Sequence, residues 1–324
     1  MPVVFTDILA ARQRIAPHIH RTRLGVSVSL GDRFGVGVRL KLEHQQVTGS
    51  FKLRGATNAV LSLDRARREA GVATASTGNH GRAVAHAARI SGTRAVVCMS
   101  ELVPENKVQA VKALGAEVRI VGRSQDDAQA EVDRLVAEEG LTAIPPFDDE
   151  LVIAGQGTLG LEMLEDAPGL SMLVVPLSGG GLISGVALAA KTVNPSIHVV
   201  GVSMERGAAM AQSLKAGHPV DVREEPTLAD SLGGGVGLQN RHTFAMVQRL
   251  VDECILLTEA EIAQGVRYAY EQEGEILEGG GAVGIAALVC GKLRPRGETG
   301  LVLSGRNIAA DLHRRIVNGE RIEA

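Results

Sequence analysis

Apolar and polar positions alternate through the middle of the chain in a pattern that predicts short strands separated by amphipathic helices. Short apolar runs predict strands at 72–75, 94–99, 117–121 and 142–144. Helical spacing predicts helices between them, at 79–90, from near Pro104 to Leu114, and between a capping Ser124 and Gly140. Strands and helices that alternate in this way imply right-handed crossovers and a parallel sheet.

A second block of strands and helices follows a pair of prolines. Pro145 and Pro146 break both element types, so a domain crossing is expected there. The tetrapeptide Thr258-Glu259-Ala260-Glu261 is a capping box and marks a helix that runs to about residue 272. Further strands are expected at 172–175, 198–202 and 300–303, with a helix at 182–190. The pattern therefore predicts an α/β protein with two sheets, whose ligands lie at the carboxyl ends of strands.

Composition and charge exclude several classes of protein. A length of 324 residues favours about two domains, and 45% hydrophobic with 22% charged residues is typical of a folded globular chain. A net charge of -3 and few aromatic residues argue against a nucleic-acid partner. The longest apolar stretch, Ala282 to Cys290, has nine residues, whereas a membrane span needs about 20.

The cysteines and the N-terminus bear on where the protein works. Cys98, Cys254 and Cys290 are odd in number, widely separated and form no CxxC pair. They indicate a reducing compartment without structural disulfides. The first 15 residues do not have the basic and apolar regions of a signal peptide. We therefore predict a cytoplasmic protein with no membrane partner.

The first segment with candidate chemistry is Thr48 to Gly55, which places Lys52 at a helix start after a turn. A single lysine is usually a solvated charge. A helix N-terminus disfavours a cation, however, and its dipole is expected to lower the pKa of Lys52 toward that of a nucleophilic amine.

The second segment, Ser76 to Gly81, connects a predicted strand to a predicted helix. Its free amides, with the side chains of Ser76, Thr77 and Asn79, suit a carboxylate or a phosphate. The simpler interpretation is an N-cap formed by one of these side chains, and His80 alone is more readily explained as a structural residue.

The third segment is a glycine-rich loop directly after the apolar strand that ends at Pro176. Its residues are Ser178, Gly179, Gly180, Gly181 and Leu182. Three glycines let the backbone wrap a phosphate, and the dipole of the following helix adds to the attraction. The loop matches neither GxxxxGK[ST] nor GxGxxG, so a phosphate is favoured but ATP is not.

The fourth segment is Ser304 to Asn307, after the last predicted strand, together with Glu278 and the glycines that follow it. Each feature alone is ordinary turn chemistry.

Together, the segments resemble the fold-type II pyridoxal-phosphate enzymes, specifically the serine/threonine dehydratase family that includes serine racemase. The resemblance covers nearly the whole chain. It is carried by S-F-K-x-R-G (50–55), S-x-G-N-H (76–80), V-I-A-G-Q-G-T (152–158), the glycine loop and S-G-x-N (304–307). It implies a tryptophan synthase β-like fold with two open, twisted, mainly parallel sheets flanked by helices. The implied domains are a large cofactor-binding domain, 1–64 plus 148–324, and a small domain, 65–147.

The resemblance also implies roles for individual residues. Lys52 would link covalently to pyridoxal 5'-phosphate and act as the general base. Phe51 and Asn79 would border the ring, with Asn79 on its 3'-oxygen; Glu278 would also contact the cofactor and Ser304 would face the pyridine nitrogen. The loop 178–182 would hold the phosphate, and Ser76, Thr77, Asn79 and His80 would bind the substrate carboxylate. A homodimer is implied as well.

The implied reaction is β-elimination from a β-hydroxy L-amino acid such as threonine or serine, giving a 2-oxo acid and ammonia. The neutral hydroxyl of Ser304 favours elimination over transamination. The alternatives are a serine racemase, a β-replacement enzyme of the same fold and a non-catalytic amino acid sensor.

Several positions depart from the family pattern. Ala211 stands where related enzymes with a divalent cation place an Asp, although Glu205 is kept, so we expect no metal. Thr77 replaces a second Ser and argues against racemisation, and Ser178 replaces a glycine of the loop. Arg306 stands where a Gly is commoner, and the segment Lys41 to His44 is also less usual. With these two features the chain looks similar to the dehydratases assigned to hydroxyectoine breakdown, which adds a hydroxyectoine-derived amino acid to the candidate substrates.

Overall fold

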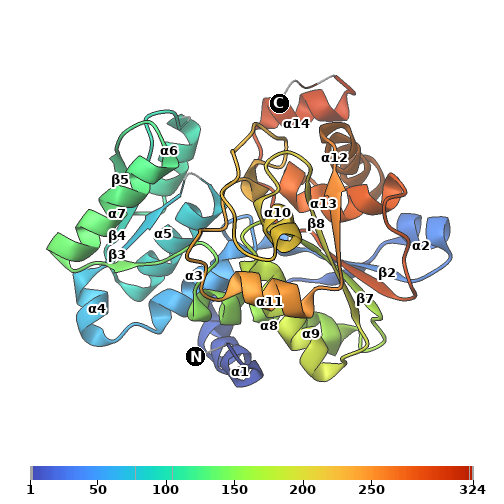
Figure 1. The fold of residues 1–324 in the computed structure, drawn as a ribbon, viewed down its shortest axis with the longest axis horizontal. Helices are drawn as coiled ribbons and strands as arrows, with labels where there is room; N and C mark the ends of the chain where they lie inside the picture. Colours follow the sequence, from blue (N-terminus) through green and yellow to red (C-terminus); the bar gives the residue numbers. More distant parts are fainter. Residues whose placement is uncertain (1–2, 77, 104, 321, 323–324) are drawn as a thin grey trace.

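Two sheets organise the protein, whose computed structural model describes residues 3–76, 78–103, 105–320 and 322 (Figure 1). The smaller sheet has four strands in the order β5-β4-β3-β6 and the larger has six in the order β1-β2-β10-β7-β8-β9. All pairings are parallel except that of β1 with β2. The predicted class, two mainly parallel sheets flanked by helices, is confirmed.

The smaller sheet follows the predicted alternation. Its strands are β3 (Val72–Ala75), β4 (Ala95–Met99), β5 (Glu117–Ile120) and β6 (Thr142–Ala143), and its helices are α4 (Arg65–Ala70), α5 (Asn79–Ser91), α6 (Glu105–Lys112) and α7 (Gln125–Glu139). Ser124 caps α7 through a bond from the Asp127 amide (3.0 Å), as predicted. Pro104, the expected start of α6, lies outside the described residues. The helix ends at Lys112, two residues early, because the chain tightens into a turn that Gly115 completes with φ +91°.

The larger sheet joins strands from both ends of the chain. It contains β1 (Leu24–Val26), β2 (Val38–Lys41), β7 (Met172–Pro176), β8 (His198–Met204), β9 (Glu253–Leu257) and β10 (Thr299–Val302). The apolar pattern predicted β7, β8 and β10 but not β1, β2 or β9, which lie toward the two edges. Partly exposed residues interrupt the apolar runs of β1 and β9, which hides them from a search for apolar segments.

Helices cover both faces of the larger sheet (Figure 1). One face carries α8 (Glu150–Asp166), α9 (Gly181–Val193) and α11 (Thr243–Leu250), with α1 (Phe5–Ile15) packed on the outside of α8. The other face carries α2 (Val28–Phe34), α12 (Glu259–Glu273), α13 (Gly279–Val289) and α14 (Ala310–Val317). Thr258 and Glu261 form the predicted capping box at the start of α12. Among the described residues, no helix is long and apolar enough to cross a membrane.

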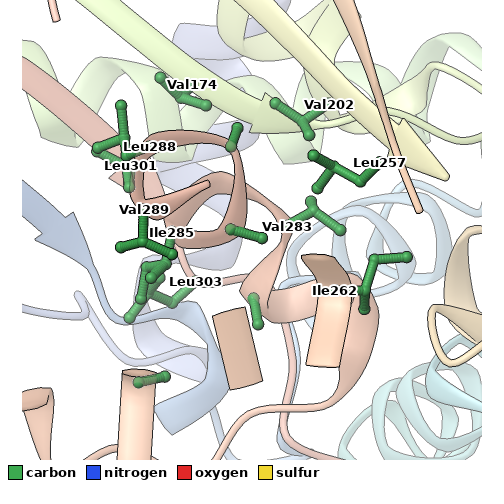
Figure 2. Packing of buried hydrophobic residues seen from close by; sticks show 14 of the residues in the cluster. Val174, Val202, Leu257, Ile262, Val283, Ile285, Leu288, Val289, Leu301 and Leu303 are labelled. Atoms are coloured by element: carbon green, nitrogen blue, oxygen red, sulfur yellow. The ribbon is translucent and has the colours of Figure 1, made fainter. Parts of the chain in front are cut away.

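The core of the larger sheet is built from aliphatic side chains (Figure 2). Val174, Val202 and Leu257 of the strands pack against Val283 of α13 and Ile262 of α12, and all five are almost completely buried. Each such side chain stabilises the fold by about 1.5–3 kcal/mol relative to an exposed position.

Glycines let the helices near the predicted lysine approach one another closely. The helix α3 (Lys52–Leu61) packs against α8 at Gly55 and Gly155. A Cβ on Gly155 would lie 2.7 Å from the Arg54 carbonyl oxygen, and one on Gly55 would lie 2.8 Å from the Val152 carbonyl oxygen. The two backbones therefore touch, which fixes the helix that begins with Lys52 against a buried helix of the large sheet.

Candidate active site

A cavity of about 320 Å³ lies at the carboxyl ends of β3, β7 and β10. It brings together every described residue that the sequence singled out as a cofactor or substrate contact. These are Phe51, Lys52, Ser76, Asn79, His80, Ser178, Gly179, Gly180, Gly181, Leu182, Glu278 and Ser304. Thr77 lies outside the described residues.

Lys52 is the first residue of α3 and is half-buried in this cavity. Its Nζ donates to the Pro146 carbonyl oxygen at 2.7 Å and lies 5.4 Å from the centre of the Phe51 ring. Burial lowers the pKa of Lys52 to about 8, against an opposing effect of the Glu278 carboxylate. The pKa falls as predicted, but desolvation rather than the helix dipole is its largest cause.

The helix α5 begins over the cavity without a side-chain cap on its N-cap residue, Gly78. Ser76 Oγ accepts from the Gly81 amide at 3.1 Å, so this hydroxyl satisfies one amide of the first turn, as the simpler interpretation expected. The His80 ring nitrogen Nε2 lies 2.8 Å from the Ile144 carbonyl oxygen. Burial, and secondarily Lys52, lowers the pKa of His80 to about 3, so the imidazole is neutral. His80 therefore offers an anion no positive charge, and the remaining amides of α5 are the stronger attraction.

The glycine loop connects β7 to α9 and fits a phosphate. Gly180 has φ +91°, and a Cβ on Gly181 would lie 2.9 Å from Phe147 Cα, so both positions require glycine. The first hydrogen bond of α9 runs from the Ser184 amide to the Gly180 carbonyl oxygen at 2.9 Å. The amides that precede it have no partner within the helix and are available to an anion.

Glu278 and Ser304 form the opposite wall. Glu278 is buried, and burial raises its pKa although Asn79, Asn307 and Ser231 donate hydrogen bonds to it. Asn79 Nδ2 lies 2.7 Å from Glu278 Oε1. Ser304 Oγ donates to the Gly280 carbonyl oxygen at 3.3 Å, a long hydrogen bond that a better acceptor can replace.

Several residues that line the cavity were not singled out from the sequence, and four of them contact the predicted site residues directly. Pro146 and Phe147 contact Lys52 and the glycine loop, and Arg82 and Asn307 lie beside Asn79. Asn307 belongs to the S-G-x-N segment, but its spacing could not show its partners. The Pro145–Pro146 break was interpreted only as a domain crossing.

A buried ionic cluster lies behind the lysine helix. The Arg54 guanidinium donates to Glu43 Oε1 at 2.7 Å and to Glu162 Oε1 at 2.7 Å, and Lys41 Nζ donates to Glu162 Oε2 at 2.6 Å. Lys41, Glu43 and Arg54 are fully buried. Lys41 and Glu43 therefore support α3 and are not among the residues that line the cavity. Arg306 is exposed and is also absent from the cavity lining.

No group of three or more His, Cys, Asp or Glu side chains within the described ranges is arranged to hold a metal ion. Glu205 lies 3.8 Å from Lys292 on the surface.

The comparison with known proteins decides the family. The family described as pyridoxal-phosphate dependent enzyme matches residues 15–305. The chain belongs to this family. Among pyridoxal-phosphate enzymes it is similar to a Sinorhizobium fredii protein named "Putative threonine dehydratase", at 59% identity over 97% of this chain and 95% of that one. It is also similar to the L-threonine ammonia-lyase of Thermotoga maritima, at 41% identity over 98% of this chain and 78% of that one.

A solved structure of a related enzyme has the same fold as this chain. Maize serine racemase superposes with a TM-score of 0.92 at 34% identity, over 98% of each chain. The chain is thus a fold-type II pyridoxal-phosphate enzyme of the serine/threonine dehydratase family, as the motifs indicated, and its cofactor is pyridoxal phosphate.

Proposed function

We propose that this protein is a pyridoxal-phosphate-dependent ammonia-lyase that dehydrates and deaminates a β-hydroxy L-amino acid such as threonine or serine, releasing a 2-oxo acid and ammonia. The carrying observation is Lys52: its amine has a pKa lowered to about 8 and lines a cavity of about 320 Å³ beside the glycine loop. The named activities of the threonine ammonia-lyase relatives support the reaction class.

We propose the cofactor contacts from the shape and donors of the cavity. The amides of 178–182 would hold the phosphate, Phe51 and Asn79 would border the ring, and Ser304 and Glu278 would lie along its edge. The glycine cradle, which a Cβ on Gly181 would fill, supports the phosphate assignment. When bound, the cofactor supplies an electron sink next to the substrate's α-carbon.

Lys52 is the group in this cavity best suited to move a proton. An amine with a pKa near 8 is deprotonated often enough at neutral pH to accept the α-proton as a general base. The Pro146 carbonyl oxygen accepts from Lys52 Nζ at 2.7 Å and would orient the free amine. The α5 amides and Ser76 would hold the substrate carboxylate, together with Asn79 and the backbone of His80, and we keep Thr77 in this proposed set from the motif.

Ser304 supports elimination over transamination. Its hydroxyl is neutral and donates a hydrogen bond to the Gly280 carbonyl oxygen, so it places no negative charge in the cavity lining. A carboxylate at that position would hold a proton on a facing nitrogen, and a hydroxyl does not.

The test is an absorbance titration of the protein reconstituted with pyridoxal phosphate, against L-threonine, L-serine, L-hydroxyaspartate and a hydroxyectoine hydrolysis product. A visible band that one compound perturbs transiently, with 2-oxo acid formed, is the expected result. Lys52→Ala should abolish the band and the product, whereas the exposed Lys112→Ala should change neither. Full 2-oxo acid production by Lys52→Ala would overturn the proposal.

The other activities give different products in the same assay. D-serine would indicate a racemase, a thioether formed with added thiol would indicate β-replacement, and a perturbed band without any product would indicate a sensor. The hydroxyectoine-derived substrate stays in the panel because pocket shape beyond the β-carbon sets that choice.

We also propose the organisation of the protein in the cell. The boundary between domains 1–64 plus 148–324 and 65–147 is supported by the two separate sheets. A homodimer is supported by the family, and analytical ultracentrifugation tests it. Free thiols at Cys98, Cys254 and Cys290 are compatible with the cytoplasm.

A further inference from the structure

Four polar side chains form one continuous hydrogen-bonded series along the cavity wall. Arg82 Nη1 donates to Asn307 Oδ1 at 3.1 Å, Asn307 Nδ2 donates to Asn79 Oδ1 at 2.5 Å, and Asn79 Nδ2 donates to Glu278 Oε1 at 2.7 Å. We call Arg82, Asn307, Asn79 and Glu278 the amide relay. It begins at a half-buried cation and ends at a buried carboxylate.

The two ends fix how both amides are oriented. A guanidinium can only donate, so Asn307 presents its oxygen to Arg82 and its nitrogen to Asn79. An ionised carboxylate can only accept, so Asn79 presents its nitrogen to Glu278. Flipping either amide would place a donor against a donor at one contact and an acceptor against an acceptor at the other. The donor-to-acceptor direction is therefore the same along the whole relay.

Asn307 is locked in this position by further contacts. Its backbone amide donates to Glu278 Oε2 at 2.9 Å, and its second Nδ2 proton is directed to the Thr48 carbonyl oxygen at 3.0 Å. Gly49, with φ +81°, makes room for it, because a Cβ there would lie 2.7 Å from Asn307 Oδ1. Thr48 leads into the turn before Lys52, so the relay and the lysine segment share an anchor.

The relay leaves Asn79 with one polar group to offer. Its oxygen and one Nδ2 proton are used, and Asn79 lines the cavity. The second Nδ2 proton is what remains for a ligand. Hydrogen bonds in series polarise one another, most strongly at low dielectric, so charge at the far end affects this last donor.

The charged groups around the relay are few. Glu278 faces Lys52, Arg82 and Asp230, and Asp230 itself is paired with Lys107 at 3.1 Å. Among the described residues, Arg82 makes no ion pair within 4.0 Å, and its side chain donates a hydrogen bond to the neutral Asn307 amide. The hydrogen-bonded connection from Arg82 to Asn79 and Glu278 therefore runs through Asn307.

We propose that Arg82 is a positioning residue that acts through Asn307 and Asn79 to orient and strengthen the hydrogen bond that Asn79 gives to the bound cofactor. The proposal rests on the proposed function, because it requires pyridoxal phosphate in the cavity. In this proposal Arg82 acts through the side chains of Asn307 and Asn79 and not through direct contact with the reacting atoms. Replacing Arg82 should therefore change the protonation of the cofactor site while the cofactor still binds.

The test is a pH titration of the visible band of the reconstituted protein without substrate, in wild type, Arg82→Gln, Arg82→Lys and Asn307→Asp. Without the Arg82 cation the hydrogen bond that Asn79 gives to the cofactor should weaken, which makes protonation of the Lys52 nitrogen easier, so the midpoint in Arg82→Gln should move up by about 0.5–1 pH unit. Arg82→Lys retains the charge and should stay closer to wild type. Asn307→Asp adds an anion and removes a donor, so it should show the largest upward shift and weaker cofactor binding. The matched control is Arg306→Gln, an exposed arginine beside Asn307, with an unchanged midpoint.

Coincident midpoints in wild type, Arg82→Gln and Asn307→Asp, with native circular dichroism, would overturn the proposal. If Arg82→Gln does not fold, the ranking of Arg82→Lys against Asn307→Asp decides: equal midpoints contradict the relay. A wild-type protein without any visible band would overturn the proposed function instead. The two failures are therefore distinguishable.

Discussion

Two buried glutamates near the lysine helix have pKa values that move in opposite directions. Burial raises the pKa of both carboxyl groups, yet the pKa of Glu43 is lowered overall and that of Glu278 is raised. Glu43 contacts the Arg54 guanidinium directly, with Lys41 nearby. Glu278 accepts its hydrogen bonds from uncharged amide and hydroxyl donors. A direct cation, and not the number of hydrogen bonds, therefore decides the sign of the shift.

The difference separates a buried ionic cluster that supports α3 from a carboxylate that lines the cavity. Charges in the cluster of Lys41, Glu43, Arg54 and Glu162 compensate one another at close range. The desolvation of the Glu278 carboxylate beside the cavity is not compensated by a cation in direct contact with it. Sites that carry chemistry commonly retain such a group.

The largest expected effect comes from removing the central cation of the buried ionic cluster. Arg54→Met leaves Glu43 and Glu162 buried without their main cation, so the free energy of unfolding should fall by about 3–5 kcal/mol. Urea unfolding measures it. The control is Arg65→Met, whose pair with Glu69 is solvent-exposed and should cost less than about 1 kcal/mol. Equal losses in the two variants would contradict the distinction.

A second experiment compares the pH dependence of stability in Glu43→Gln and Glu278→Gln. The folded pKa of Glu43 lies below its ordinary 4.5, so its contribution is present above that value and is lost as the pH falls through the folded pKa. The folded pKa of Glu278 lies above 4.5, so its contribution is present below that value and is lost as the pH rises through the folded pKa.

Unfolding titrations from pH 4 to 8 should therefore diverge. Glu43→Gln should lose about 3 kcal/mol near neutral pH, with a smaller deficit in acid. Glu278→Gln should gain stability relative to wild type as the pH rises. If the free energies of unfolding of the two variants changed with pH in parallel, the two carboxyl groups would have pKa shifts of the same sign, which would contradict the prediction.

A third experiment measures the effect of Glu278 on Lys52. Because the carboxylate raises the pKa of the amine, Glu278→Gln should lower that pKa from about 8 by roughly 0.5–1 unit. The rate at which pyridoxal phosphate combines with the apoprotein, followed by absorbance against pH, reports the free amine. Glu138→Gln, on the exposed face of α7, should leave the midpoint in place. An upward shift in Glu278→Gln would contradict the electrostatic assignment.

The smallest effect is expected at the mouth of the cavity. Lys107 and Asp230 form a partly exposed pair at 3.1 Å, so Lys107→Met should change the free energy of unfolding by about 0.2–1 kcal/mol. Salt should reduce that difference further. A loss as large as that of Arg54→Met would mean that exposure is not what separates the two clusters.

The sequence predicted most of the fold because its signals were local. Apolar runs marked the interior strands, and the side chains of Ser124 and Thr258 marked helix starts. The strands β2 and β9 escaped because partners distant in the chain complete them: β2 pairs with β10, and β9 pairs with β8.

The candidate site could be predicted only in part for a related reason. Lys52, Asn79 and the glycine loop stand out by residue type and position next to a strand or helix. Arg82 and Asn307 gain their meaning from contacts between distant segments, which spacing does not reveal. The sequence also could not show that Lys41 and Glu43 are buried in the ionic cluster under α3.

The strand order of the larger sheet has a consequence for how the protein is made. The strands of the smaller sheet follow one another in a single stretch of chain, so they can pair soon after synthesis. The strand β2, near the beginning, must wait for β10, near the end, because Val38 lies opposite Thr299. Ser304 follows β10 directly, so the ribosome delivers this part of the cavity lining after nearly all the other residues that line it. Until then, the edge of β2 is open, and the nascent chain is most exposed to aggregation during that interval.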